Sequence, residues 1–483
     1  MSPESAILAA LAVPVIGALA IAACDRRPDL RETATLATSV ILLACVASLL
    51  RPVLDGARPE VALVEMLPGI ALAFRVEPLG MSFALLASAL WIVNSLYSIG
   101  YMRGNGEKHQ TRFYVCFALA LASTMGIAFS ANLLTLFVFY EALTLITYPL
   151  VTHHGDGEAQ QGGRTYLGLL LGTSILFLLP AIALTWAIAG TLDFVPGGIL
   201  RSGLSNAAIG GLLALYVFGI GKAALMPVHR WLPAAMVAPT PVSALLHAVA
   251  VVKAGVFSLV KVIVYVFGVD QIAGLKSVDW LPFVSGFTII AASIIALRSD
   301  NLKRRLAYST VSQLSYVVLS VSLLTPLSVA GAALHIVAHA LGKITLFFAA
   351  GAIYTASHKT EVSELDGIGR RMPWTMAAFA VGALSMIGLP PTAGFVSKWF
   401  ILSGAMGAAN WVAVAVIAAS TLLNAGYFLP IVYRAFFREG DGRAHGEAPA
   451  TMVAALVLTA LATIAFFFMS DIPVALARRL AGA

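Results

Sequence analysis

Two histidines and a lysine stand at spacings of four in the segment HIVAHALGK, residues 335–343. Positions four apart lie on one face of an α-helix, so His335, His339 and Lys343 would form one row. Imidazole and amine groups bind and release protons, and a lysine removed from water can do so near neutral pH. The surrounding run is almost wholly apolar, where charged groups are rare and costly. The row therefore predicts proton exchange inside a membrane protein.

Other proton-exchanging side chains fall inside apolar runs in the same way. Every basic residue there is a lysine, although an arginine would hold its charge more firmly. Each such lysine costs on the order of 3 kcal/mol of insertion free energy, so a chain that carries several is expected to use them. The lysines are Lys222, Lys253, Lys261, Lys343 and Lys398, and His247 precedes Lys253 in the same run. Lys261 lies near the end of its run and could instead extend its amine to the membrane surface.

Glu141, in FVFYEALTLITY, is the acid that the sequence places deep within an apolar run. Nothing near it in the sequence neutralises it, so its partner must come from another helix. Lys222, in VFGIGKAALMP, is the natural candidate, because such a pair couples two protonation equilibria.

Simpler interpretations exist for each of these groups. His335 and His339 could only hydrogen-bond across helices. Glu141 and Lys222 could form a static ion pair, and the charges could merely fix helix register in a scaffold that conducts nothing. A series that continues through Lys253, Lys343 and Lys398 is harder to explain without charge movement.

The elements that must position these groups are membrane helices. The chain has 483 residues, of which 60% are hydrophobic and 11% charged, and its mean hydropathy is +0.91. Runs of about 20 apolar residues follow one another, so we expect an all-α polytopic membrane protein with about 14 spans. The expected spans are 5–24, 33–52, 77–101, 111–130, 132–152, 164–189, 206–226, 241–268, 279–298, 303–324, 327–355, 373–389, 410–434 and 450–470.

Two of these spans are interrupted by proline. The segment MPVHRWLP (226–233) contains Pro227 and Pro233, and GLPPTAG (388–394) contains Pro390 and Pro391. Proline removes backbone donors, which a membrane tolerates only where the chain lines protein or water.

The loops carry Lys and Arg asymmetrically. If the N-terminus lies outside, most loop Lys and Arg residues fall on the inner side, as the positive-inside rule requires. We therefore expect a multi-pass protein of a prokaryotic cytoplasmic (inner) membrane, with both termini outside and a first helix that is retained. The net charge of +7 follows from this bias and calls for no nucleic-acid partner.

Motifs of other chemistries are absent or weak. The three cysteines form no close pair, which disfavours a metal site or a disulfide framework. The segment THHGDGE (152–158) could bind a metal ion, but an exposed loop is the simpler interpretation. GK at 221–222 lacks the upstream glycine of a phosphate loop. We therefore expect no catalytic residue, no cofactor and no metal.

Three segments carry a family resemblance. HRWLPAAMVAPTPVSALLHAVAVVKAG (229–255), HIVAHALGK (335–343) and SMIGLPPTAGFVSKW (385–399) resemble signature segments of antiporter-like proton-translocating subunits. Such subunits occur in respiratory complex I, in membrane-bound hydrogenases and in multi-subunit Mrp-type cation/proton antiporters. The resemblance implies two inverted five-helix repeats, spans 4–8 and 9–13, with spans 7 and 12 broken. It divides the chain into a three-helix segment (1–105), two repeats (106–268 and 269–437) and a C-terminal helix (438–483).

The resemblance also implies a role for each buried charge. Glu141 matches the family's span-5 glutamate, Lys222 its span-7 lysine and Lys253 a bridging position in span 8, where His247 is a recurrent neighbour. The remaining matches are His339 and Lys343 on the central axis of span 11 and Lys398 at the end, in span 12.

The length of the chain and the segment ELDGIGRRMPWTMAAF (364–379) most resemble those of the D subunit of Mrp-type antiporters. The implied function is proton translocation in a multi-subunit Na⁺/proton antiporter, with other membrane subunits as partners and protons and Na⁺ as substrates. Three alternatives stay open. The chain could be a proton-pumping subunit of a redox complex, such as an NADH or ferredoxin dehydrogenase or a membrane-bound hydrogenase. It could also be a module that energises uptake of an inorganic substrate such as bicarbonate, or the non-conducting scaffold.

Overall fold

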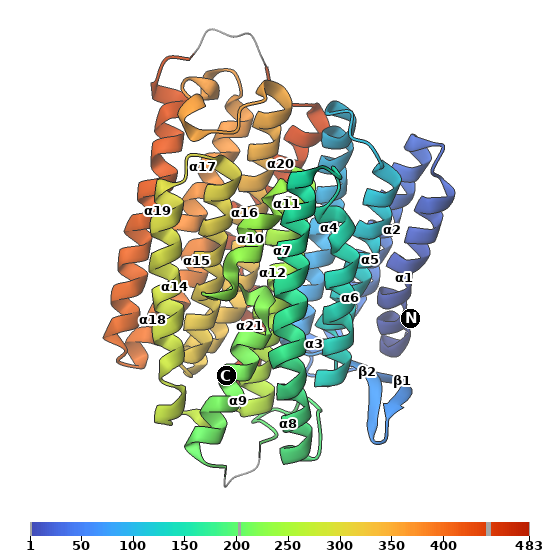
Figure 1. Cartoon of the computed structure of the whole chain (residues 1–483), viewed down its shortest axis with the longest axis vertical. Coiled ribbons are helices and arrows are strands. Elements are labelled where there is room, and N and C mark those ends of the chain that lie inside the picture. The colour runs from blue at the N-terminus through green and yellow to red at the C-terminus, as the bar shows by residue number, and fades with distance from the viewer. Residues whose placement is uncertain (1, 201–203, 441–445, 483) are drawn as a thin grey trace.

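Long apolar helices run side by side along the long axis of the molecule (Figure 1). The computed structural model describes residues 2–200, 204–440 and 446–482, without the side chains of residues 246 and 247. A helix satisfies its own backbone hydrogen bonds, which is why apolar segments adopt this form in a membrane.

The first part of the chain consists of α1 (Pro3–Ala23), α2 (Pro28–Ser48), α3 (Leu50–Leu54), β1 (Glu60–Leu67), β2 (Ile70–Arg75), α4 (Pro78–Gly104), α5 (Gln110–Ala128), α6 (Leu133–Val151), α7 (Gly157–Thr173), η1 (Ser174–Leu178) and α8 (Leu179–Ala189). The middle consists of α9 (Asn206–Gly219), η2 (Gly221–Ala223), η3 (Val228–Arg230), α10 (Trp231–Ala234), η4 (Ala235–Val237), α11 (Thr240–Ala244), η5 (Leu245–Val249), α12 (Val251–Val262), η6 (Ile263–Phe267), α13 (Val269–Ile272) and η7 (Lys276–Val278). The last part consists of α14 (Trp280–Arg298), α15 (Leu302–Ser322), α16 (Pro326–Ser357), η8 (Val362–Glu364), η9 (Ile368–Arg370), α17 (Pro373–Ile387), α18 (Ala393–Gly407), α19 (Trp411–Phe437), α20 (Ala450–Phe468) and α21 (Asp471–Leu480).

The predicted polytopic helical fold is confirmed, but the count of fourteen spans is not. By length and composition, 10 helices in the described part could cross a membrane. Two further apolar helices, α9 and α17, are too short because each ends at a break. The segment that includes α12 is also divided into shorter pieces. α15 begins with the polar sequence LKRR and carries serine, threonine and glutamine along its length, so it is less apolar than the other long helices.

Both predicted breaks are present. After α9 the chain continues through the short helices η2, η3, α10 and η4, with Pro227 between η2 and η3 and Pro233 inside α10. Pro390 and Pro391 lie between α17 and α18. Such interruptions leave backbone carbonyls without helical partners, and the amine of Lys398 donates to two of them at the end of α17. The internal repeat stays a prediction.

The central helix is α16, which has 32 residues. Its most apolar stretch is 94% buried inside the protein, against 33% for α19. Thr325 and Ser328 form a reciprocal capping box at its start. Tyr97 of α4 donates a hydrogen bond to the carbonyl of Phe348 at 2.8 Å and stacks on its ring. The row of His335, His339 and Lys343 therefore lies in the protein interior.

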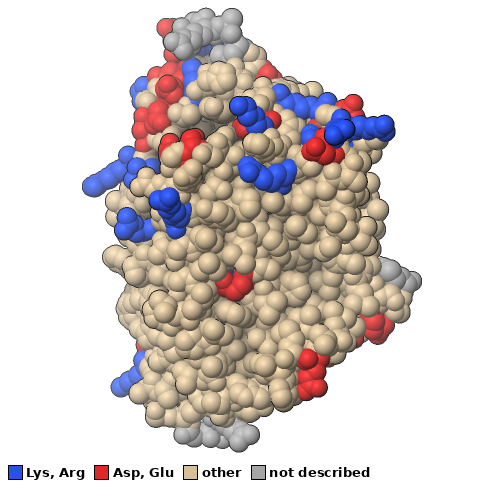
Figure 2. Space-filling model, turned by 45° about the vertical axis from the view of Figure 1, so that its right-hand side comes forward, with Lys and Arg blue, Asp and Glu red and all other residues tan. Residues whose placement is uncertain are grey.

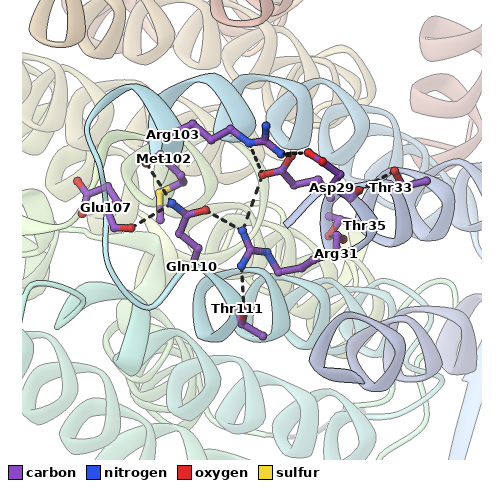
Figure 3. Close-up of polar contacts among 10 residues, drawn as sticks. Asp29, Arg31, Thr33, Thr35, Met102, Arg103, Glu107, Gln110 and Thr111 are labelled. Atoms are coloured by element: carbon purple, nitrogen blue, oxygen red, sulfur yellow. Dashed lines mark hydrogen bonds and ion pairs between the residues drawn. The ribbon is translucent and has the colours of Figure 1, made fainter. Parts of the chain in front are cut away.

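A charged network joins the ends of α2, α4 and α5 (Figure 3). Arg103 donates to Asp29 at 2.5 Å and to both carboxylate oxygens of Glu32 at 2.9 and 2.5 Å. Arg31 donates to Gln110 at 2.7 Å on the other side. Glu32 is buried. Glu141 is therefore not the only acid that the fold removes from water.

The molecular surface fits a membrane. In Figure 2, Lys and Arg gather toward the upper end of the visible face, above a broad belt that carries almost no charged side chains. Large apolar side chains such as Leu422 and Phe468 are exposed. Exposed apolar surface of this extent is expected to face lipid or other membrane subunits.

A β-hairpin after α3 is a feature that the helical prediction omits (Figure 1). β1 and β2 pair antiparallel from Glu60 opposite Arg75 to Leu67 opposite Ile70. Gly69 in the turn has a φ of 78°, a conformation that glycine adopts without strain.

Candidate proton-relay site

Lys222 occupies the break after α9. Its amine donates to the carbonyl of Tyr140 at 2.8 Å and to the hydroxyl of Thr144 at 2.6 Å, both on α6. The amine nitrogen lies 3.2 Å from the centroid of the Tyr140 ring, a cation–π arrangement. The side chain is fully buried. The broken segment thus turns a single amine onto α6.

The predicted direct contact between Glu141 and Lys222 is not formed. Glu141 follows Tyr140 on α6 and its carboxylate oxygens are buried, but among the described residues no ion pair joins it to Lys222. Successive residues of a helix point about 100° apart, so an amine that sits over the Tyr140 ring does not also reach the next side chain. Glu141 is therefore the neighbour in sequence of the residue that holds the amine, and it does not contact the amine itself.

Lys253 and His339 meet directly. Lys253 lies on α12 and His339 on α16, and a hydrogen bond joins the amine to Nδ1 of the imidazole. Both side chains are buried. The structure thus brings together two residues that are 86 positions apart in the sequence. The side chain of His247 lies outside the described part of the structure.

His335 continues the row toward α18. Its ring is stacked on that of His339, with centroids 6.2 Å apart. Its Nδ1 is 2.9 Å from the hydroxyl of Ser397 and its Nε2 is 3.1 Å from Oε1 of Gln313. Ser397 precedes Lys398, so this branch ends beside the last lysine.

Lys343 points from α16 to α15. Its amine donates to the hydroxyl of Ser309 at 2.9 Å and to the carbonyl of Leu306 at 3.4 Å. The same serine hydroxyl is 3.1 Å from the hydroxyl of Tyr427 on α19. Serine and tyrosine are common in membrane helices, so nothing in the sequence singled out these two partners.

Lys398 sits against the second break. Its amine donates to the carbonyls of Met386 and Ile387 at 2.8 and 3.0 Å, which are the last two residues of α17. Lys398 and Lys222 therefore use the two breaks differently: Lys222 lies within a break, whereas Lys398 reaches across one.

Lys261 is buried in the protein, and its described contacts are not with the row. Its amine lies 3.4 Å from a carboxylate oxygen of Glu77 and donates to the carbonyl of Ser130 at 2.5 Å. The side chains of Lys261 and Glu77 are 0% and 1% exposed. Glu77 precedes the first residue of α4 and appeared in the sequence only as a span end. A lysine of this depth requires a counter-charge, and that requirement is the signal that could have found it.

Gly255 sets the distance between α12 and Lys222. A Cβ atom at this position would lie 2.2 Å from the carbonyl carbon of Lys222 and 2.3 Å from the nitrogen of Ala223. No side chain fits between these backbones. The glycine therefore allows the helix that carries Lys253 to lie against the segment that carries Lys222.

We expect Gly255→Ala to separate these two elements. Overpacking of this kind destabilises a protein by about 1–3 kcal/mol, and the altered separation should slow proton transfer about tenfold or more. Thermal unfolding of the purified assembly and vesicle transport assays would measure the two effects. The matched control is Gly168→Ala on α7, where no heavy atom lies within 4 Å of the added Cβ. Equal behaviour of the two variants would show that the close approach at Gly255 has no role.

The histidine loop after α6 is largely exposed, as the sequence suggests, from His154 to Glu158, but its first histidine is an exception. His153 is buried, and Glu107 lies 3.7 Å from both His153 and His154. Burial lowers the pKa of His153 to about 4. Beside this cluster is a cavity of about 730 Å³ lined by Glu107, His154 and Lys303 among others. Across the described residues, no group of three or more His, Cys, Asp and Glu side chains could hold a metal ion.

Comparisons with known proteins place these residues in a family context. The model of the NADH:quinone oxidoreductase/Mrp antiporter transmembrane family matches residues 130–424, a range that contains every predicted relay residue. The chain is 35% identical over 369 residues to NADH-quinone oxidoreductase subunit N of Desulforudis audaxviator, covering 75% of this chain and 72% of that one. It is 33% identical over 343 residues to a probable K(+)/H(+) antiporter subunit of Rhizobium meliloti, covering 69% of this chain and 33% of that one.

Two solved structures share the fold. A chain of the Mrp complex from Dietzia sp. DQ12-45-1b aligns with a TM-score of 0.89 at 22% identity, covering 100% of this chain and 97% of that one. A chain of the membrane-bound sulfane sulfur reductase, an archaeal respiratory membrane complex, aligns with a TM-score of 0.87 at 23% identity, covering 99% and 97%. At these identities the likeness concerns the fold.

Proposed function

Because the chain belongs to the NADH:quinone oxidoreductase/Mrp antiporter transmembrane family, we propose that it is the proton-translocating subunit of a multi-subunit monovalent cation/proton antiporter, with Na⁺ as the exchanged cation. It would act with other membrane subunits in a prokaryotic cytoplasmic membrane, with both termini outside. The names of its relatives support this assignment at the level of the family.

One observation carries the proposal: buried lysines and histidines follow one another through the middle of the bundle. Lys222, Lys253 and Lys343 are each fully buried, and their described hydrogen bonds go to carbonyls, hydroxyls and an imidazole. An amine held by such neutral partners can lose its proton without leaving a carboxylate unpaired. A set of lysines that served only to fix helix register would be expected to carry paired acids, as Lys261 does.

The relay would run from Glu141 through Lys222 and Lys253 to His339 and Lys343 and on to Lys398, with water in the gaps. His335, beside His339 and Ser397, would belong to the same interior row. Movement of the Lys222 amine between the Tyr140 carbonyl and Glu141 would control whether it keeps its proton. Approach to Glu141 favours the protonated amine, and withdrawal favours transfer toward Lys253. Lys398 would exchange the proton with one aqueous side.

A second candidate function is a proton-pumping subunit of a redox complex. The 35% identity to an NADH-quinone oxidoreductase subunit favours it, because that relative takes its name from electron transfer. In such a complex, subunits that carry the electron-transfer groups would drive the same relay.

The test uses the intact assembly, extracted in mild detergent. Its iron content and flavin absorbance would be measured, and its co-purifying chains identified by mass spectrometry. The assembly would then be placed in vesicles, where Na⁺ or K⁺ is added across a preset pH gradient. Cation-dependent proton exchange without iron or flavin is the expected result. Stoichiometric iron and flavin would favour the redox pump, and proton exchange that neither cation stimulates would contradict the antiporter.

A further inference from the structure

A second hydrogen-bonded connection joins Lys343 to Lys398 through α19. From the Lys343 amine it passes to Ser309 at 2.9 Å and from there to the hydroxyl of Tyr427 at 3.1 Å. Tyr427 donates to Oδ1 of Asn424 one helical turn away. The amide of Asn424 donates at 3.4 Å to the carbonyl of Met386, the carbonyl that also accepts from Lys398.

Every member of this connection is buried. Ser309, Tyr427 and Asn424 are 0% exposed, so bulk water does not compete for their hydrogen bonds. The connection involves three helices, because Ser309 lies on α15, Tyr427 and Asn424 on α19 and Met386 at the end of α17. It is separate from the branch through His335 and Ser397, which uses α16 and α18.

The hydroxyl of Ser309 takes part in contacts between helices, as do those of Ser312 and Ser320 on the same helix. Thr310 and Ser315 donate to the carbonyls four residues before them, Leu306 and Val311. That arrangement is the usual way for a hydroxyl to be satisfied inside a helix. In its described hydrogen bonds, Oγ of Ser309 instead accepts from Lys343 and from Tyr427.

We propose that the hydroxyl of Tyr427 transfers the proton between Lys343 and Lys398, with Ser309 as the intermediate donor and Asn424 as the gate. This inference rests on the proposed function, because it assigns a route within the same relay.

In this step the hydroxyl of Ser309, which accepts from both Lys343 and Tyr427 in the structure, turns to donate to Tyr427. The protonated amine of Lys343 then gives a proton to Oγ of Ser309 while Ser309 gives its own to the Tyr427 oxygen. Tyr427 passes its proton to a water molecule that takes the place of Oδ1 of Asn424, and this water protonates the neutral amine of Lys398. The net change is one proton moved from Lys343 to Lys398, with each hydroxyl restored. An amide cannot relay a proton as a hydroxyl does, so Asn424 must move aside for the transfer.

The test is Tyr427→Phe in the intact assembly, which removes the hydroxyl and keeps the ring. We expect proton turnover to fall about 10²-fold, the usual effect of losing a positioned proton-transfer group, with assembly and thermal midpoint unchanged. Ser309→Ala should lose a similar factor, and the double variant no more than either single one, because the two groups act in series. The residual turnover of either variant should show a larger solvent deuterium isotope effect, which a purely structural role would not produce.

The matched control is Tyr216→Phe, which removes another buried tyrosine hydroxyl, one bonded to Thr185 at 2.7 Å. Turnover in this control should be unchanged. The inference is overturned if Tyr427→Phe and Ser309→Ala both keep normal turnover while Lys222→Ala is inactive. Normal turnover in Lys222→Ala as well would instead reject the proposed relay itself. If Tyr427→Phe failed to assemble, Ser309→Ala would decide the question alone.

Discussion

Lys222→Ala is expected to abolish proton transport, with a fall in turnover of at least about 10²-fold. The Lys222 amine is the only titratable group that the described part of the broken segment turns toward Tyr140 and Thr144. Alanine offers no site for a proton there. The assembly should stay intact, because a buried charge raises the free energy of membrane insertion and its removal relieves that cost. Proton uptake by vesicles that contain the assembly, followed with a pH-sensitive dye, would measure the loss.

Lys222→Arg distinguishes a need for charge from a need for proton exchange. A guanidinium remains protonated in proteins, so this variant keeps the charge and should still be inactive. The control is Lys276→Ala, which removes an exposed lysine far from the row in the sequence and should transport normally. Normal turnover in Lys222→Ala would contradict the relay, and activity in Lys222→Arg would show that only a fixed positive charge is needed.

The positions of the helices could be predicted because hydropathy and proline act locally. Each predicted span has a counterpart, and the row on α16 lies on one face as its spacing requires. The hairpin of β1 and β2 was missed because two short strands leave a weak signal beside such long apolar runs. The number of spans could not be fixed, since the broken segments are too short to be counted as ordinary spans.

The partners of a side chain could be predicted from the sequence only where a buried titratable group needs another polar group beside it. The meeting of Lys253 with His339 agrees with the idea of one interior row. The partner of Lys222 was not predictable, because Tyr140 and Glu141 are adjacent in the sequence and only the orientation of the broken segment decides between them. Ser309, Tyr427 and Asn424 carry no charge and resemble any other polar residue of a membrane helix.

The same reasoning explains why Glu77 was overlooked. An acid just before Pro78 is typical of the exposed start of a helix. The hairpin of β1 and β2 leads directly into this position, and the amine of Lys261 approaches from α12. Burial of Glu77 thus depends on contacts between segments far apart in the sequence, which hydropathy does not encode.

Glu77→Gln should destabilise the protein by about 3–5 kcal/mol, the usual effect of leaving one member of a buried ion pair alone. Lys261 would keep its hydrogen bond to the Ser130 carbonyl but would lose its only counter-charge among the described residues. The thermal midpoint of the purified assembly should fall clearly, and transport should fall with it at temperatures near the new midpoint.

The double variant Glu77→Gln with Lys261→Met determines whether the pair is structural. It removes both charges and keeps similar volumes, so most of the lost stability should return, as is found when buried pairs are replaced together. Transport should return with it, because Lys261 contacts Glu77, Ser130 and two phenylalanine rings but none of the relay residues in the described structure. A stable double variant without transport would instead place Lys261 within the proton pathway. A double variant as unstable as Glu77→Gln alone would show that the loss comes from Glu77 itself and not from an uncompensated lysine.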